Sequence, residues 1–494
     1  MGFGDAPIVD GKVTGDDFEL IVEMESFGEI RRATIQGKIV GDELHLTPAM
    51  PPRPAGAGAG PGSGPGSGPG SGPVAGPGGT PRGGAGPGGP GGPPRAPMGP
   101  VVARRGTPTP SYRAAPIDYK SLPKLDLPTL RPIPYNGLAK TPPMGWNSWN
   151  KFRTRFDDKT VRQIADAFVS SGMKDAGYLY VNIDDGWQGK RDANGVLQPN
   201  PNFPDMKALA DYVHSKGLKL GIYSSPGPTT CAGFTGSYGH EEIDAKTWAA
   251  WGIDYLKYDW CSASRVWKED SMQPVYQRMG DALRKAGRPI VYALCQYGRN
   301  NVQQWGPQVG GNLWRTTGDI RDQWTSMATI GFAQSDLAPF AAPGHWNDPD
   351  MLEIGNGGMT PDEYRTHFSL WALVASPLLA GNDIRAMDDA TRSILLNKEV
   401  IAIDQDKLGK AASRVSQSGD TELWARPLDK GAWAVGLFNR GAAETEIAVK
   451  WADLRLKGKW RVRDLWAHAD RGAHADGFSA KVPSHGVVLL RLSR

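Results

Sequence analysis

The sequence contains few cysteines, little net charge and no long apolar run, and each shortage excludes a class of protein. Three cysteines among 494 residues are too few for a disulfide scaffold, and their spacing is not that of a zinc site. The formal net charge is only +4, with no basic block interleaved with aromatic residues, so we expect no nucleic-acid partner. No apolar run approaches the roughly 18 to 20 residues of a membrane-spanning helix, so we expect no membrane span.

Glycine and proline are concentrated in one part of the chain. Residues 51–100 contain 20 Gly and 15 Pro, whereas the remainder has an ordinary globular composition. The Gly-Pro-Gly-Ser repeat has a period of four, which excludes a collagen triple helix. Because such a tract has few side chains to bury, burial cannot offset the entropy cost of ordering it. We therefore predict a disordered Gly/Pro-rich linker over residues 51–116.

Residues 1–50, ahead of the linker, predict a small β segment. Stretches 11–20 and 37–46 are similar, and each contains a Gly-Asp pair between alternating runs, which is typical of a β-hairpin. About 50 residues provide only a marginal hydrophobic core. No pattern in this segment indicates a chemistry, and we assign it no role.

Residues 117–405, after the linker, alternate between helical and strand patterns. Val161, Ile164 and Phe168 have the spacing of one helix face. After a first strand near Trp146, strands are expected at 178–185, 219–223, 255–259, 290–295, 312–317, 346–351 and 377–380. Eight strands alternating with helices match a (β/α)8 TIM barrel in size and order, and a doubly wound open sheet is the alternative.

Residues 406–494 predict a separate C-terminal antiparallel β-sandwich. The helical pattern stops there, and short strand patterns follow one another closely, at 423–426, 433–438, 446–449, 460–463 and 487–491. The chain also contains 17 Trp. Abundant Trp with little net charge is typical of proteins that bind sugar rings, although buried Trp is the commoner case.

The polar residues at the predicted strand ends indicate a chemistry, because these ends meet at the C-terminal mouth of a barrel. Most are acidic or aromatic: Trp146, Asp184, Asp185, Tyr223, Lys257, Asp259, Cys295, Gln296, Arg315, Asp319, Asp348 and Asp350. Carboxylates accept hydrogen bonds from sugar hydroxyls, and two of them can hydrolyse a glycosidic bond. A single Asp there is more often a helix N-cap, but six on one face favour a glycoside-hydrolysing site.

Six motifs carry a resemblance to a known family. They are 141–150 (TPPMGWNSWN), 183–187 (IDDGW), 221–223 (GIY), 256–261 (LKYDWC), 314–320 (WRTTGDI) and 346–351 (WNDPDM). In order and spacing they resemble glycoside hydrolase family 27, the α-galactosidase or melibiase family, from about Leu138 to the C-terminus. The resemblance implies hydrolysis of terminal α-D-galactosyl residues of oligosaccharides or polysaccharides by retaining double displacement, with neither metal nor cofactor.

The resemblance also implies roles for individual residues. Asp259 matches the nucleophile and Asp319 the general acid/base, and a retaining mechanism places two such carboxyls roughly 5 to 5.5 Å apart. Asp184 and Asp185 match the pair that binds the 4- and 6-hydroxyls, and Trp146 matches the aromatic floor. The other implied substrate contacts are Tyr223, Lys257, Cys295, Gln296, Arg315 and Asp350. The Lys257 charge is also expected to keep Asp259 ionised.

The segment Cys295-Gln296-Tyr297 departs from the family pattern, because galactosidases often carry Cys-Glu-Trp there. The resemblance implies that this segment contacts the substituent at C2, where Gln296 would be too large to admit an N-acetyl group, so a free 2-hydroxyl is expected. The alternatives within the family are an α-N-acetylgalactosaminidase and a β-L-arabinopyranosidase, the latter disfavoured by Asp185. A non-catalytic carbohydrate-binding protein is the alternative from another class, and the presence of both catalytic carboxyls disfavours it.

Cys231 and Cys261 match a disulfide of the family. A disulfide implies an oxidising compartment, so we expect a secreted or periplasmic protein, with a cytosolic enzyme holding free thiols as the alternative. The residues after Met1 have neither a basic n-region nor an apolar h-region, so no signal peptide is present as written. We therefore expect the true start to lie upstream.

Overall fold

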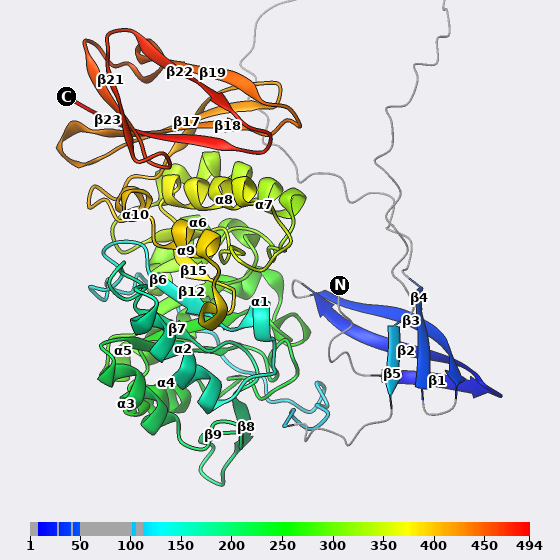
Figure 1. The fold of residues 1–494 in the computed structure, drawn as a ribbon. Helices are drawn as coiled ribbons and strands as arrows, with labels where there is room; N and C mark the ends of the chain where they lie inside the picture. Colours follow the sequence, from blue (N-terminus) through cyan, green and yellow to red (C-terminus); the bar gives the residue numbers. More distant parts are fainter. Residues whose placement is uncertain (1–7, 27–28, 41–42, 50–100, 105–111) are drawn as a thin grey trace, which may run out of the picture. The chain divides into compact units, whose positions relative to one another are not determined.

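The computed structural model describes residues 8–26, 29–40, 43–49, 101–104 and 112–494 (Figure 1). The chain divides into two compact units. One comprises Met1–Met24 with Ile30–Thr109, and the other comprises Glu25–Glu29 with Pro110–Arg494. The second unit contains the barrel and the β-sandwich.

The first unit is a five-stranded sheet whose strands follow chain order. The strands are β1 (Ile8–Thr14), β2 (Asp17–Ser26), β3 (Glu29–Val40), β4 (Glu43–Ala49) and β5 (Val101–Arg104). The predicted hairpin between β1 and β2 is confirmed: Thr14 pairs with Asp17 across a turn in which Gly15 has φ +61°. Val22, Ala33 and Ile35 form the small core of this sheet.

The linker prediction needs one correction. Most of the predicted linker, residues 51–100 and 105–111, lies outside the described residues. Residues 101–104, which we assigned to it, form β5 and pair antiparallel with Glu43–Leu46 of β4. The physical reason is that a Val-Val-Ala-Arg stretch has β-branched residues suited to a strand, and β4 has an edge left to pair.

Eight parallel strands in the second unit form the barrel, and the TIM-barrel prediction is confirmed. They are β6 (Met144–Asn147), β7 (Tyr180–Asn182), β10 (Lys219–Ser224), β11 (Tyr255–Asp259), β12 (Val291–Cys295), β13 (Leu313–Arg315), β14 (Trp346–Asp348) and β15 (Leu378–Ala380). Neighbours in the sheet follow chain order, and β15 pairs with β6. A parallel bridge from Leu352, just after β14, to Ala380 of β15 joins the remaining edges, as a closed barrel requires and an open sheet does not.

Helices follow most of the barrel strands and cover them (Figure 1). They are α1 (Trp149–Phe152), α2 (Asp158–Ser170), α3 (Met206–Ser215), α4 (Glu241–Trp251), α5 (Met272–Lys285), α6 (Val302–Trp305), α7 (Trp324–Gly331), α8 (Pro361–Leu373), α9 (Asp389–Leu395) and α10 (Lys398–Asp404). The predicted apolar face of α2 is buried, and the Asp157 side chain caps its N-terminus by accepting from the Thr160 N–H. Across the described residues, no helix has both the length and the apolar character needed to cross a membrane.

The C-terminal β-sandwich is also confirmed. Its six-stranded sheet runs β16 (Ser413–Ser418), β17 (Thr421–Pro427), β18 (Trp433–Asn439), β23 (Val487–Ser493), β20 (Trp460–Asp464) and β21 (Ala469–His474), beside a pair of β19 (Thr445–Lys450) and β22 (Gly477–Val482). The sequence pattern missed β16, β21 and β22, because most of their residues are polar or exposed.

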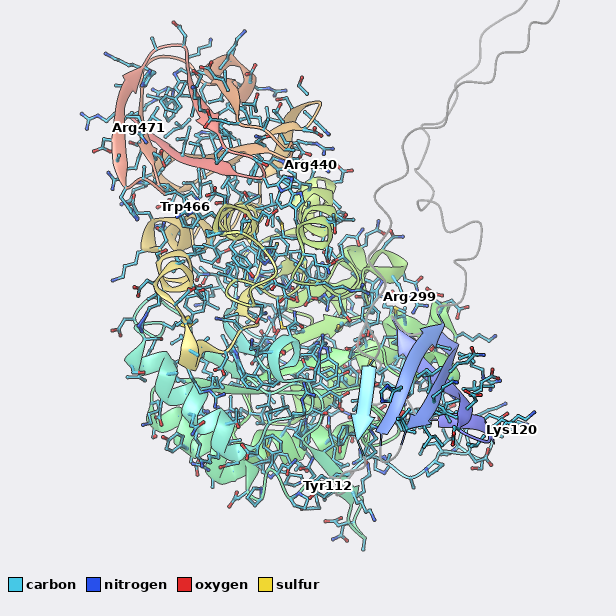
Figure 2. The ribbon with its side chains drawn as sticks, turned by 45° about the vertical axis from the view of Figure 1, so that its right-hand side comes forward. Tyr112, Lys120, Arg299, Arg440, Trp466 and Arg471 are labelled. Carbon is cyan, nitrogen blue, oxygen red and sulfur yellow. A yellow bond between two sulfur atoms is a disulfide. The ribbon has the colours of Figure 1, made fainter. Side chains whose placement is uncertain are left out.

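The sandwich packs on the barrel helices and shares a core with them. Trp424 and Phe438 of the sandwich belong to the same buried cluster as Trp371 of α8. The Trp466 indole, labelled in Figure 2, donates a hydrogen bond to the Ser369 hydroxyl of α8 over 2.8 Å. The barrel therefore carries the sandwich at one end as part of the same packed unit.

Candidate active site

A cavity lies at the carboxyl ends of the barrel strands, where the sequence places most of the predicted site residues. Its lining consists of Trp149, Asn150, Asp184, Asp185, Tyr223, Cys231, Lys257, Asp259, Tyr297, Arg315, Asp319, Asp350 and Met351. Three predicted contacts are not in the lining: Trp146, Cys295 and Gln296. The lining contains five carboxylates and two cations, and the chemistry of the cavity follows from how each of them is held.

Asp259 ends strand β11 and is only 5% exposed. Its Oδ2 accepts a hydrogen bond from the Tyr223 hydroxyl over 3.1 Å, and its Oδ1 accepts one from the Tyr297 hydroxyl over 2.6 Å. Burial raises the pKa of Asp259 to about 6, while the charge of Lys257 and the Tyr297 hydrogen bond lower it. Lys257 thus favours the ionised form of Asp259, as expected, but it does not cancel the effect of burial.

Lys257 lies two residues before Asp259 on the same strand, and its side chain is part of the same cavity wall. Its Nζ donates to Asp184 Oδ2 over 2.9 Å, and the same oxygen accepts from Asn147 Nδ2 over 2.8 Å. Burial alone would lower the pKa of Lys257, but the charges of Asp184 and other nearby carboxylates hold it well above its ordinary value. Lys257 and Asp184 therefore form a buried ion pair.

Asp185 has one satisfied and one unsatisfied oxygen. Its Oδ2 accepts from the Ala232 N–H over 2.7 Å, whereas the buried Oδ1 has no hydrogen-bond partner. Burial raises the pKa of Asp185 to about 7, against the lowering effect of hydrogen bonds from the Ala232 N–H and the Thr230 hydroxyl, and the charges of Asp184 and Asp259 raise it further. A buried acceptor without a partner costs free energy, and Asp185 lines the cavity, so a hydroxyl group bound there would satisfy it.

Arg315 joins two carboxylates on the opposite part of the wall. Its Nη2 lies 3.1 Å from Asp319 Oδ1 and 3.1 Å from Asp350 Oδ2. The Asp350 carboxylate also accepts from the Ile320 N–H over 2.8 Å, which holds the loop that carries Asp319. The side chains of Arg315 and Asp350 are buried, but that of Asp319 is 54% exposed. Asp319 is thus positioned by a fixed cation and remains accessible to water.

The Trp146 prediction is wrong. Trp146 is fully buried within β6, and its indole N–H donates to the Asn382 carbonyl over 2.8 Å. Trp149 lines the cavity instead. Asn147 accepts from the Trp149 N–H over 2.8 Å and turns the chain into α1, which brings the second Trp of the motif to the mouth. The sequence offered a signal for this residue, because the same motif contains a second Trp three residues after Trp146.

The predictions for Cys295 and Gln296 also need correction. Cys295 is buried, with its sulfur 3.6 Å from Arg315 Nη1. The Gln296 amide bonds within its own loop, where it accepts from the Gly298 N–H and donates to the Arg299 carbonyl. Tyr297, which has φ +63°, lines the cavity in their place. This residue was missed because a left-handed turn follows no strand or helix period.

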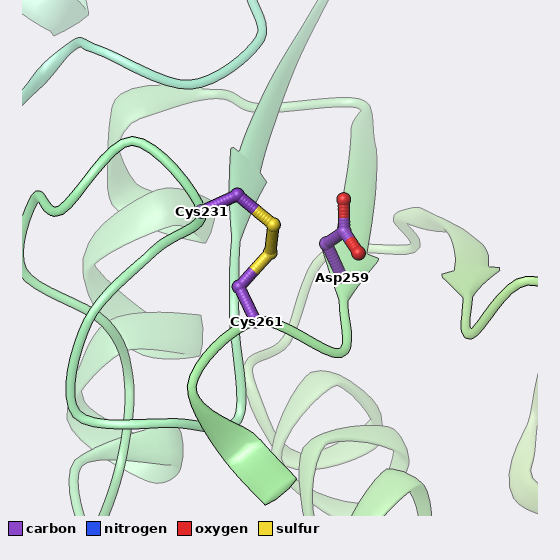
Figure 3. Close-up of side chains that lie close together, drawn as sticks. All are labelled: Cys231, Asp259 and Cys261. Carbon is purple, nitrogen blue, oxygen red and sulfur yellow. A yellow bond between two sulfur atoms is a disulfide. The ribbon is translucent and has the colours of Figure 1, made fainter. Parts of the chain in front are cut away.

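The predicted disulfide between Cys231 and Cys261 is present, with a Cα–Cα distance of 4.8 Å. It lies beside Asp259, as Figure 3 shows. The two sulfurs and the Asp259 carboxylate lie within 4.8 Å of one another, a spacing suited to a metal ion. Because the sulfurs are bonded to each other, they are not available as thiolate ligands.

Comparison with known proteins gives matches over both domains of the second unit. A family model described as alpha galactosidase A matches residues 141–406, and one described as alpha galactosidase C-terminal beta sandwich domain matches residues 418–492. The chain is 48% identical over 384 residues to alpha-galactosidase A of Cellvibrio japonicus, covering 73% of this chain and 93% of the relative. It is 50% identical over 364 residues to an alpha-galactosidase of Cyamopsis tetragonoloba, covering 72% and 87%. The solved structure of a Saccharomyces cerevisiae galactosidase with raffinose aligns with a TM-score of 0.70 at 30% identity, covering 73% of this chain and 99% of that one.

Proposed function

The chain belongs to the α-galactosidase family, glycoside hydrolase family 27, and from this premise we propose which residues perform its reaction. It is a glycoside hydrolase with the activity of a retaining α-galactosidase. We assign Asp259 as the nucleophile and Asp319 as the general acid/base. The observation that supports both assignments is that the two carboxyls line one cavity from different strand ends, one held by tyrosines and the other by Arg315.

In the first step, the Asp259 carboxylate attacks the anomeric carbon of the galactosyl residue and forms a covalent ester. The bond from that carbon to the glycosidic oxygen breaks, and Asp319 gives its proton to the departing oxygen. Asp259 must be ionised for this step, which the Lys257 charge and the tyrosine hydrogen bonds favour. Asp319 must hold a proton, which its access to water allows it to exchange.

In the second step, Asp319 removes a proton from a water molecule that attacks the same carbon. The ester bond to Asp259 breaks, galactose leaves with its original anomeric configuration, and Asp319 is again protonated. Arg315 remains paired with Asp350 throughout, so it can hold the Asp319 carboxyl in place in both protonation states.

The remaining lining residues bind the sugar. We assign Asp184 and Asp185 to the 4- and 6-hydroxyls, because Asp185 Oδ1 is a buried acceptor without a partner at the cavity wall. Trp149 takes the role of the aromatic platform that we predicted for Trp146. The Tyr297 side chain occupies the wall beside the nucleophile, and we propose that it leaves room for a 2-hydroxyl but not for an N-acetyl group.

The substrate is a terminal α-linked galactosyl residue of an oligosaccharide or polysaccharide. The yeast relative was solved with raffinose, an α-galactoside, and we propose that this chain accepts the same chemical class. The Cys231–Cys261 disulfide supports an oxidising compartment, secreted or periplasmic. Counting free thiols in protein isolated from its native compartment tests this point, and three free thiols would contradict it. We propose that the barrel domain spans residues 117–405 and the sandwich domain residues 406–494, with β5 belonging to the first unit.

The experiment compares hydrolysis of nitrophenyl α-galactoside, α-N-acetylgalactosaminide and β-L-arabinopyranoside by the wild type and Asp259→Asn. The matched control is Asp383→Asn, because Asp383 pairs with Arg385 and does not line the cavity. We expect preference for the galactoside and a loss of at least about a thousandfold in kcat for Asp259→Asn only. Wild-type turnover in Asp259→Asn would show that the nucleophile is wrongly assigned. NMR of the first product should show the α-anomer of galactose.

A further inference from the structure

Two tyrosine hydroxyls connect the nucleophile to the disulfide. The Tyr223 hydroxyl lies 3.1 Å from Asp259 Oδ2 and 3.1 Å from the Cys261 sulfur. The Tyr297 hydroxyl lies 2.6 Å from Asp259 Oδ1 and 3.6 Å from the Cys231 sulfur. Each oxygen of one carboxylate thus has its own tyrosine, and each tyrosine rests against one sulfur of the same covalent bridge.

Tyr297 is held in this position by its backbone. It has φ +63°, a left-handed conformation that is sterically unfavourable for a residue with a side chain. The next residue, Gly298, has φ +76°, and a Cβ built there would lie 2.1 Å from the Thr316 carbonyl oxygen. The Gln296 side chain closes the turn by accepting from the Gly298 N–H. Strain of this kind persists where the surroundings impose it, and it is frequent at active sites.

The hydrogen bonds leave the carboxylate able to react. An ionised carboxylate has about four lone-pair positions on its two oxygens. One tyrosine on each oxygen therefore fixes the plane of the group and still leaves lone pairs free for the anomeric carbon. Burial raises the pKa of Tyr297 well above its ordinary value, so its hydroxyl remains a donor at neutral pH.

We propose that Tyr297 is a positioning residue for the nucleophile: its hydroxyl, placed by the left-handed turn and the adjoining disulfide, orients Oδ1 of Asp259 for attack. The proposal rests on the assignment of Asp259 as nucleophile. It gives a role to the position at which this chain departs from the Cys-Glu-Trp pattern of related galactosidases, because a phenolic hydroxyl there reaches the carboxylate.

The groups around Asp259 determine in which direction its pKa should change when the Tyr297 hydroxyl is removed. Asp184, just after β7, and Asp319, in the loop after β13, raise its pKa, while Lys257 from its own strand lowers it. The Tyr297 hydrogen bond also lowers the pKa of Asp259. Removing this donor should therefore raise the pKa of Asp259. The loss of one hydrogen bond to a charged carboxylate should shift this pKa by about one pH unit.

The test is the pH dependence of kcat/KM for Tyr297→Phe on nitrophenyl α-galactoside. The acidic limb of this profile reports the essential base of the free enzyme, and we expect it to move upward by about one pH unit. Tyr292→Phe is the matched control, because this buried tyrosine lies on β12 and donates to the Tyr276 carbonyl over 3.0 Å. Its profile should keep the position of the wild-type limb.

Two results would overturn the proposal. A loss of activity in Tyr297→Phe by the same factor at every pH would indicate a structural role only. An unchanged pH profile would indicate that the Tyr297 hydroxyl has no role in orienting Asp259. The melting temperature of each variant checks that it is folded at the pH values used. If Asp259→Asn keeps its turnover, the nucleophile assignment fails first, and if it is inactive while the Tyr297→Phe limb stays in place, only the positioning role fails.

Discussion

Replacing Asp185 by Asn should make the protein more stable at alkaline pH and a poorer enzyme. Asp185 is 1% exposed, its Oδ1 has no hydrogen-bond partner, and burial raises its pKa to about 7. Above that pH the folded protein carries a buried negative charge that an amide removes. Asn also keeps an oxygen that can accept from the Ala232 N–H. Because Asp185 is a proposed hydroxyl ligand, kcat/KM for galactosides should fall.

The sign and size of the stability effect follow from proton linkage. The folded-state pKa is raised above the ordinary value of 3.8, so the folded protein holds a proton that the unfolded chain has released. This contribution to stability is fully present below pH 3.8 and is lost as the pH rises through about 7. The pH rises by about two units between pH 5 and the folded-state pKa near 7. Over this range the unfolding free energy of the wild type therefore falls by on the order of 2 to 3 kcal/mol. The Asn variant loses none of it.

The assay is thermal unfolding of wild type and Asp185→Asn at pH 5 and pH 8. The melting temperature of the variant relative to wild type should be about 3 °C higher at pH 8 than at pH 5. Asp383→Asn is the control: its Arg385 hydrogen bond lowers the pKa of Asp383, so its titration lies outside this pH window. A difference for Asp185→Asn that is equal at both pH values, or a variant less stable at pH 8, would refute the reasoning.

Three further predictions concern the platform, the buried ion pair and the disulfide. Trp149→Ala should raise KM for galactosides about tenfold, as steady-state kinetics can check, with little change in melting temperature. Trp146→Ala should instead lower the unfolding free energy by about 3 to 5 kcal/mol, as thermal unfolding can check. Lys257→Met removes the cation that pairs with the buried Asp184 carboxylate. It should lower stability by about 3 to 5 kcal/mol and should also lower kcat/KM. Reducing the disulfide should lower stability by about 3 to 4 kcal/mol, and thiol titration of the denatured protein should then rise from one thiol to three.

The strand ends show why much of the site could be predicted from the sequence. Lys257 and Asp259 are two residues apart on one strand, and side chains two apart point to the same face. The barrel geometry then brings the ends of all eight strands to one mouth, so Asp184, Asp185 and Arg315 meet there. Local pattern and chain order suffice for such positions, because the regular period of a strand determines which side chains share a face.

The sequence by itself therefore determined the barrel, the sandwich and the acidic strand ends, and its motifs identified the disulfide pair. Only the tertiary structure decided that Trp149 rather than Trp146 forms the cavity wall. It likewise decided that Tyr297 lines the cavity, whereas Cys295 and Gln296, the expected substrate contacts, do not. It also decided the pairing of β5 and the exposed edge strands. The physical reason is the same in each case: beyond the regular elements, the direction of a side chain depends on turn conformation and on neighbours distant in sequence, and neither has a period that can be read along the chain.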